Sequence, residues 1–341
     1  MNSVQSIPED NLLGIPTEVA EGIYQIRLPL PFALDHINVY LVEDSDGWIL
    51  VDTGIKSEKS QKILENILDK LPESRPLKAV LATHAHVDHI GVAGWICDKW
   101  KVPLWVSKPE YDGINQFLAM NPAEDPILSK SLNEFYHQGG IPESEYELII
   151  KGLLGFQRAF YPLPRAYKVL ESGTLTIKNE TWDIFVNDGH TVAHVSLFNR
   201  NRNILISGDQ VLARISSNVS VRFGDANGNP LKTWIDGLLK LKELPPSTLV
   251  LPSHEKSMTN LSARIDELVE GYLENAHKIT RFCKTPSTVE ELLRALFPRE
   301  LSPFEHHLAY GETRSYINYQ IAQQKLEVVG GESDIPLYVA I

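Results

Sequence analysis

Short apolar runs alternate along the chain with segments in which apolar residues recur every three or four positions. The runs predict strands near residues 23–30, 37–42, 48–52, 78–82, 102–106, 175–177, 182–187, 195–198, 204–207 and 248–251. The periodic segments predict helices over 56–71, 91–100 and 233–244. Strands that alternate with helices in this way indicate a layered α/β protein.

The stretch 108–165 interrupts this alternation. Its pattern is mainly helical, prolines separate its segments, and it is rich in aromatic residues. We expect a helical insert whose aromatic residues pack mostly with one another. Because the insert precedes the second group of strands, some of these residues, with Phe156 and Phe160 as candidates, are also expected to cover a site as part of a lid.

A different order of elements follows the last predicted strand. A long helix is expected over 258–283, and the run Ser287-Thr-Val-Glu290 predicts a capping box that opens a second helix ending near Phe297. A third helix is expected over 312–325. The chain then predicts a hairpin of strands 326–329 and 337–340, with Gly330-Gly331 in its turn.

Length and composition set the broad class. The 341 residues exceed the size at which one hydrophobic core usually stops growing, so a main domain with an appendage is expected. The 43% hydrophobic and 22% charged content is ordinary for a globular protein, and the net charge of −12 disfavours general attraction to nucleic acid. The two cysteines are far apart and predict buried thiols. Without an evident signal peptide or a membrane-length apolar run, we expect a cytoplasmic location and no membrane partner.

Chemistry is concentrated directly after the strand 78–82. His84, His86, Asp88 and His89 lie within six positions. His84 and His86 are two residues apart, so an extended backbone turns both imidazoles to one side. Imidazole and carboxylate ligands without a thiolate suit Zn, Fe or Mn. The run therefore predicts a metal site.

The pattern His-x-His-x-Asp-His after a strand resembles the signature of the metallo-β-lactamase-fold hydrolases. Three further motifs occur in the order that the family requires, with His190 in Asn-Asp-Gly-His-Thr-Val-Ala-His, Asp209 in Ile-Ser-Gly-Asp-Gln and His254 in Leu-Pro-Ser-His-Glu. An upstream Val51-Asp-Thr-Gly54 also matches. The resemblance covers roughly residues 20–260.

The resemblance implies a metal centre with two ions per chain, expected as Zn²⁺, with Fe or Mn as alternatives. Carried over to this chain, its ligands are His84, His86 and His190 for one ion, Asp88, His89 and His254 for the other, and Asp209 as the bridge. Asp88 would also orient the nucleophile. Asp52 and His194 would hydrogen-bond to the ligands from behind, although a packing role for His194 is an equal alternative. Other histidines, namely His137, His277, His306 and His307, match no motif and are expected at the surface.

The resemblance also narrows the fold to a four-layer αββα sandwich. We expect a catalytic domain over 1–260, with the helical insert at about 108–165, and a winged-helix-like module over 261–341. The order of helices and hairpin in that module is similar to one lactamase-B-like subgroup, and the catalytic part resembles glyoxalase II-like members.

The function implied is a binuclear-metal-dependent hydrolase that uses a metal-bound hydroxide on an ester, thioester or lactone. An endoribonuclease, a mono-iron sulfur dioxygenase and a noncatalytic metal-binding scaffold are the alternatives. Arg214 and Asn218 are weaker candidates to anchor a substrate anion. We expect a small molecule as the partner. Nucleic acid is disfavoured but left open as a partner. A homodimer is possible.

Overall fold

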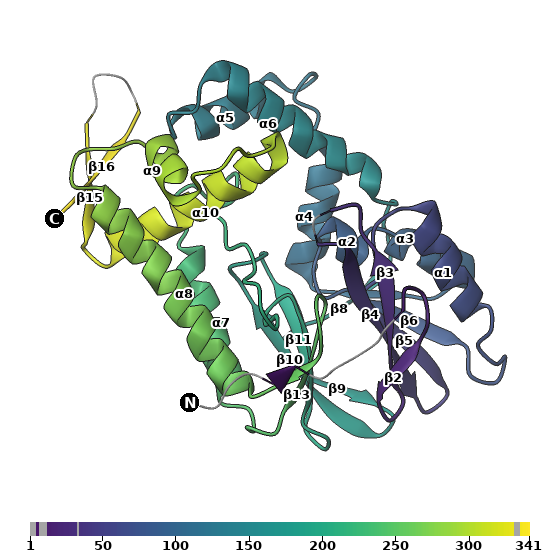
Figure 1. Cartoon of the computed structure of the whole chain (residues 1–341). Helices are drawn as coiled ribbons and strands as arrows, with labels where there is room; N and C mark the ends of the chain where they lie inside the picture. Colours follow the sequence, from purple (N-terminus) through teal and green to yellow (C-terminus); the bar gives the residue numbers. More distant parts are fainter. Residues whose placement is uncertain (1–4, 7–11, 33, 331–334) are drawn as a thin grey trace. The chain divides into compact units, whose positions relative to one another are not determined.

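The computed structural model describes residues 5–6, 12–32, 34–330 and 335–341 (Figure 1). Its chain packs into two compact units. The first unit consists of residues 1–117, 158–217 and 240–265, and the second of residues 118–157, 218–239 and 266–341. Most elements appear near the places that the sequence pattern predicts.

One seven-stranded sheet of the first unit has the order β2-β3-β4-β5-β6-β7-β8. Its strands are β2 Thr17–Ala20, β3 Ile23–Pro29, β4 His36–Asp44, β5 Gly47–Val51, β6 Leu77–Leu81, β7 Leu104–Val106 and β8 Tyr167–Val169. The pairs up to β5 are antiparallel, and those from β5 to β8 are parallel. The carboxyl ends of β5 and β6 therefore lie at one edge, where Asp52 and the histidine-rich loop follow.

The other seven-stranded sheet has the order β1-β14-β13-β12-β11-β10-β9. Its strands are β1 Gln5–Ser6, β9 Gly173–Ile177, β10 Glu180–Asn187, β11 His194–Asn199, β12 Ile204–Gly208, β13 Leu249–Pro252 and β14 Met258–Thr259. β10 and β12 are both antiparallel to β11, and β13 is parallel to β12. Three strands thus end at the same edge, and the loops after them carry His190, Asp209 and His254.

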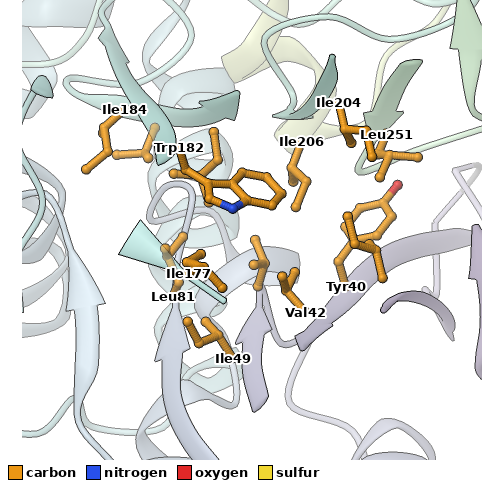
Figure 2. Close-up of a cluster of buried hydrophobic side chains, with 14 of the residues drawn as sticks. Tyr40, Val42, Ile49, Leu81, Ile177, Trp182, Ile184, Ile204, Ile206 and Leu251 are labelled. Carbon is orange, nitrogen blue, oxygen red and sulfur yellow. The ribbon is translucent and has the colours of Figure 1, made fainter. Parts of the chain in front are cut away.

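A core of buried side chains lies between the two sheets (Figure 2). Tyr40 and Ile49 of the first sheet point toward Trp182, Ile206 and Leu251 of the second, and each of these side chains is at most 1% exposed. Burying a large apolar side chain contributes roughly 1.5–3 kcal/mol. The apolar runs of the sequence therefore fix how the two sheets face each other.

Helices complete the first unit. They include α1 Glu58–Leu68, the short α2 Val87–Ile90 and α3 Ala93–Trp100, whereas α4 Lys108–Ala119, α7 Pro230–Lys242 and α8 Leu261–Phe282 extend beyond the bounds of the unit. The side chain of Ser57 caps α1 by accepting from the amide of Ser60. α1 packs against β3, and α3 packs against β6 and β7.

The second unit combines the helical insert with the C-terminal elements. They are α5 Pro126–His137, α6 Glu143–Gly155, the first half of the 3₁₀ turn Phe156–Ala159, most of α7 and α8, α9 Val289–Leu296, α10 Pro303–Ala322 and the hairpin β15 Leu326–Val329 with β16 Leu337–Ala340. The Tyr310 hydroxyl donates to the Phe135 carbonyl, and the two rings meet edge to face at 5.3 Å. The insert therefore packs with the C-terminal helices, while the predicted functional boundary near residue 260 stays a prediction.

Three element predictions need correction. The capping box lies one residue later than predicted, between Thr288 and Glu291. Met258 belongs to β14, and α8 begins only at Leu261 because Asn260 adopts a left-handed φ of 61° that a helix cannot include.

The third correction concerns α10. It begins at Pro303, not near residue 312, and has a second capping box between Ser302 and Glu305 with Pro303 in its first turn. That start signal is present in the sequence, although the apolar pattern did not predict it. The predicted C-terminal hairpin is confirmed, whereas Gly331 of its expected turn lies outside the described residues.

Candidate metal centre

Three imidazoles converge where β6 and β10 end. His84 lies in the loop after β6, His86 lies directly before α2, and His190 lies in the loop after β10. The ring centroid of His86 is 4.6 Å from that of His84 and 4.5 Å from that of His190. One ligand atom from each of these histidines and one from Asp209 all lie within 4.8 Å of one another. Segments from both sheets thus form a first ligand group.

A second group contains Asp88 and His89 of α2 and His254 after β13, with its ligand atoms also within 4.8 Å of one another. The carboxylate of Asp209 faces both groups. Its Oδ1 is 3.5 Å from His89 Nε2 and 3.4 Å from His254 Nε2, and its Oδ2 is 3.4 Å from His190 Nε2. The structure therefore brings together all seven residues named as ligands and places Asp209 between the groups.

The donor atoms fit divalent metal ions. His84 and His89 are fully buried, and the Nε2 atoms of both lack a hydrogen-bond partner among the described residues. A buried polar atom without a partner costs about 1–3 kcal/mol. A metal ion would remove this cost, and nitrogen and oxygen donors without thiolate suit Zn, Mn or Fe.

In the metal-free centre, the pKa values of the two ligand groups are shifted in different directions. Burial lowers the pKa of His84 well below its usual value, with the neighbouring His89 adding to the effect. Burial opposes protonation of His254 too, but the carboxylates of Asp209 and Asp88 outweigh it and raise the pKa of His254 to about 10. Although burial raises the pKa of Asp88, His89 and His254 lower it to about 2. The second group thus holds a proton that a metal ion has to displace.

Asp52 supports the second group from behind. Its Oδ2 accepts from His89 Nδ1 at 2.8 Å and from the Thr83 hydroxyl at 2.9 Å, while its Oδ1 accepts from the Thr83 amide at 2.8 Å. The bond to His89 keeps the proton on Nδ1 and leaves Nε2 free to bind a metal. Asp52 does so with a left-handed φ of 60°, an uncommon backbone conformation for a residue other than glycine.

His194 holds the backbone of Asp209. Its Nε2 accepts from the Asp209 amide at 3.0 Å. Burial, with His190 nearby, holds the pKa of His194 well below its usual value, so the ring is neutral and can accept. Gly208 makes this contact feasible, because a Cβ there would lie 2.4 Å from His194 Nε2 and because its φ is 56°.

Further contacts secure the loop of His254, and no pattern in the sequence indicates them. Asn38 Nδ2 donates to the carbonyls of Pro252 and Glu255, and the Tyr40 hydroxyl donates to the same Pro252 carbonyl at 2.6 Å. His254 Nδ1 donates to the His36 carbonyl at 2.9 Å, which directs its Nε2 toward Asp209. No spacing in the sequence pairs β4 with residues more than 200 positions away.

The two residues proposed more weakly to bind substrate, Arg214 and Asn218, lie in different surroundings. The Nε of Arg214 pairs with Glu255 at 3.0 Å, and 82% of the Arg214 side chain is exposed. The amide of Asn218 donates to the Leu308 carbonyl at 3.3 Å and to Glu312 Oε2 at 2.9 Å, so it is engaged within the second unit. A role of either residue in binding substrate stays a prediction.

The two aromatic candidates also differ. Phe160 is only 7% exposed and lies edge to face with Phe117 in the first unit. Phe156 packs against Phe304 in the second unit, with ring centroids 4.3 Å apart. Phe160 therefore has a clear packing role.

A third group of metal-type side chains occurs in the second unit, formed by Glu145, Glu290 and His306. Arg294 already pairs with both carboxylates, at 2.7 Å from Glu290 and 3.2 Å from Glu145, and His306 Nε2 bonds Glu290 at 2.8 Å. This group is a salt-bridge cluster. It also corrects the expectation that His306 is a surface residue, because only 12% of its side chain is exposed.

Comparison with known proteins agrees with this geometry. Residues 33–254 match the Metallo-beta-lactamase superfamily. The chain is a member of this superfamily. A beta-lactamase domain protein from Burkholderia ambifaria is 30% identical, with 99% of this chain and 98% of that chain covered and a TM-score of 0.89. A metallo-beta-lactamase family protein from Thermus thermophilus is 20% identical, with 95% of this chain and 100% of that chain covered and a TM-score of 0.78.

The relatives also indicate the class of activity. The probable metallo-hydrolase YqjP of Bacillus subtilis (strain 168) is 26% identical over 90% of this chain and 94% of its own length. The family and its relatives make the chain a metal-dependent hydrolase with the predicted metallo-β-lactamase fold. Among the described residues, no helix is both long and apolar enough to cross a membrane.

Proposed function

We propose that this superfamily member is a binuclear hydrolase that cleaves an ester, thioester or lactone. The observation that carries the proposal is the pair of ligand groups that share Asp209. A single mononuclear site would leave the donors of one group facing one another without a cation. We assign Zn²⁺ to both positions because the donors are imidazoles and carboxylates.

The residues of the site would have different roles in catalysis. Bound divalent ions would lower the pKa of a water molecule and polarise the substrate oxygen. Asp88, whose Oδ2 is 3.4 Å from His254 Nε2, lies at the side of the second group and would accept a hydrogen bond that orients the nucleophile. Asp52 and His194 would keep His89 and Asp209 in fixed orientations, which lowers the cost of organising the site during reaction.

The substrate class rests on the apolar side chains near the ligands. Val192 is 37% exposed and follows His190 by two positions, and Ile215 is 40% exposed on the loop that Glu255 holds beside His254. Exposed apolar groups beside a metal centre suit an acyl chain with a polarised carbonyl better than a row of phosphates.

Two of the five basic residues of the insert pair with acids and so favour the same choice over a ribonuclease. Lys108 pairs with Asp112, and Lys130 lies 3.6 Å from Glu134, so both charges are partly neutralised by the helix that carries them. A backbone-binding groove would instead need basic side chains that are free to contact phosphates. We therefore place the endoribonuclease second.

Metal analysis and substrate profiling test the proposal together. Protein purified without added metal is expected to contain two Zn per chain by elemental analysis and to hydrolyse acyl thioesters, aryl esters or lactones. A double variant, His84→Ala with His86→Ala, serves as the matched inactive control. One Fe per chain with oxygen consumption would support the dioxygenase. Salt-sensitive RNA cleavage without acyl turnover would support the nuclease, and bound metal without turnover of any of these substrates would support the noncatalytic scaffold.

A further inference from the structure

A buried carboxylate connects the two loops that carry the first ligand group. Glu110 lies in the first turn of α4 and is 2% exposed. Its Oε2 accepts from the amide of Ala85 at 2.8 Å, and its Oε1 accepts from the amide of Ala193 at 2.7 Å. Ala85 stands between His84 and His86, and Ala193 lies between His190 and His194.

These two loops belong to different sheets. The loop of Ala85 follows β6 in the first sheet, whereas the loop of Ala193 leads into β11 of the second. Ser107 adds to the connection, because its hydroxyl donates to the Ala193 carbonyl at 2.8 Å. Both backbone groups of Ala193 are thus held by the segment at the start of α4.

We infer that Glu110 is a positioning residue for the metal centre: its carboxylate fixes the distance between His84 and His86 on one loop and His190 on the other. The inference rests on the proposed function only in taking these three histidines as ligands of one ion. A carboxylate suits the task since both of its oxygens accept, and charge-assisted bonds are stronger than neutral ones. The positive end of the α4 dipole stabilises the buried charge.

The alternative is that Glu110 only stabilises the fold. Glu110→Gln separates the two roles, because glutamine has nearly the same shape but one acceptor and one NH₂ group. One of the two loop amides would then face a donor, and its loop would shift. A structural role predicts a lower melting temperature with an unchanged metal environment, whereas a positioning role predicts a changed environment for one ion.

The test is a titration of metal-free protein with Co²⁺, followed by visible absorption and by competition with a chelator. We expect Glu110→Gln to bind one of the two ions about tenfold more weakly and to show shifted d–d bands. Glu312→Gln is the matched control, since the half-buried Glu312 bonds Asn218 and Tyr316 in the second unit rather than a ligand loop. Its spectrum and affinities should match those of the wild type.

Ser107→Ala gives a second and milder variant that keeps the carboxylate. It removes only the bond to the Ala193 carbonyl, so we expect a smaller band shift in the same direction. If Glu110→Gln binds two Co²⁺ ions with wild-type spectrum and affinities, the positioning role is refuted while the binuclear hydrolase stands. Because no substrate is used, an error in the acyl substrate class leaves this result unaffected.

Discussion

Asp52→Asn is the substitution that isolates how one ligand is oriented. The change replaces one carboxylate oxygen by an NH₂ group and keeps the shape of the side chain. Asparagine also tolerates the left-handed φ of 60° at this position, so the backbone has no reason to move. The remaining side-chain oxygen can still accept from the Thr83 amide. The NH₂ group would then point at His89 Nδ1, which now has to give up its proton.

The magnitude follows from the tautomer of His89. Without the acceptor at 2.8 Å, the neutral ring places its proton on Nε2, the atom that faces Asp209 and the metal position. Loss of such a supporting carboxylate typically lowers metal affinity about 10- to 100-fold. That change corresponds to about 1.4–2.7 kcal/mol. The loss of affinity should be larger for the second ion, since Asp52 bonds His89 directly but reaches His84 only through the Thr83 hydroxyl, which lies 3.0 Å from His84 Nδ1.

Competition against a chromophoric zinc chelator measures both stepwise affinities. Asp183→Asn provides the matched control, because Asp183 pairs with the exposed Arg200 away from the ligand loops. We expect one affinity of Asp52→Asn to fall and both affinities of Asp183→Asn to stay unchanged. Wild-type affinities at both positions in Asp52→Asn would refute the orienting role. An equal loss at both positions would show that Asp52 supports both ligand groups, through Thr83 as well as through His89.

Four further results are expected. Asp209→Ala should lose bound metal and activity together, because its carboxylate faces both groups; two metal ions by elemental analysis with near-normal turnover would show that it is not the bridge. Since the pKa of His254 is about 10 in the metal-free protein, metal affinity should rise as the pH increases toward that value, and calorimetry in buffers of different ionisation enthalpy should detect proton release near neutral pH. A metal affinity that does not change with pH would contradict this prediction. Gly208→Ala should lower the free energy of unfolding by roughly 2–5 kcal/mol through backbone strain and overpacking, as chemical denaturation can measure. Phe160→Ala should lower it by about 3–5 kcal/mol, and an unchanged stability with a raised KM would instead favour a substrate role.

The fold could be predicted where residues repeat in a regular pattern. The apolar runs around Ile49, Leu81 and Ile206 identified strands because these side chains are buried between the sheets. The start of α10 was missed because the segment 303–311 has no clear apolar stripe: residues 303–308 are exposed or half-buried, and the buried residues 309–311 are consecutive, so they lie on different sides of the helix. Periodicity detects a helix with one buried face and fails for a helix that is surrounded.

The candidate ligands that the structure brings together could be named from the sequence because metal coordination demands particular side chains at short spacing. The residues that hold the ligands could not all be found, because their partners are distant in sequence and many act through the backbone. Glu110 contacts amides 25 and 83 positions away, and any residue at those positions other than proline would offer the same N–H group. Asp52 was found only because it forms part of a motif. Substrate preference depends on side chains at the rim of the site, where no such chemical demand restricts the residue type.

Three residues next to the candidate ligands share an unusual backbone conformation. Asp52 follows β5, Gly208 ends β12, and Glu255 follows β13 by three residues, and all three have left-handed φ values between 56° and 67°. Such a conformation turns the chain sharply at a strand end, so the next side chains point across the edge of the sheet. For the two acidic residues the conformation costs of order 1–3 kcal/mol, and side-chain bonds offset it: Asp52 accepts from Thr83, and Glu255 accepts from the Arg214 amide at 2.6 Å. The same carboxylates that stabilise these turns thereby hold the ligand loops, so removing either one should disturb the metal centre even though neither belongs to the two ligand groups.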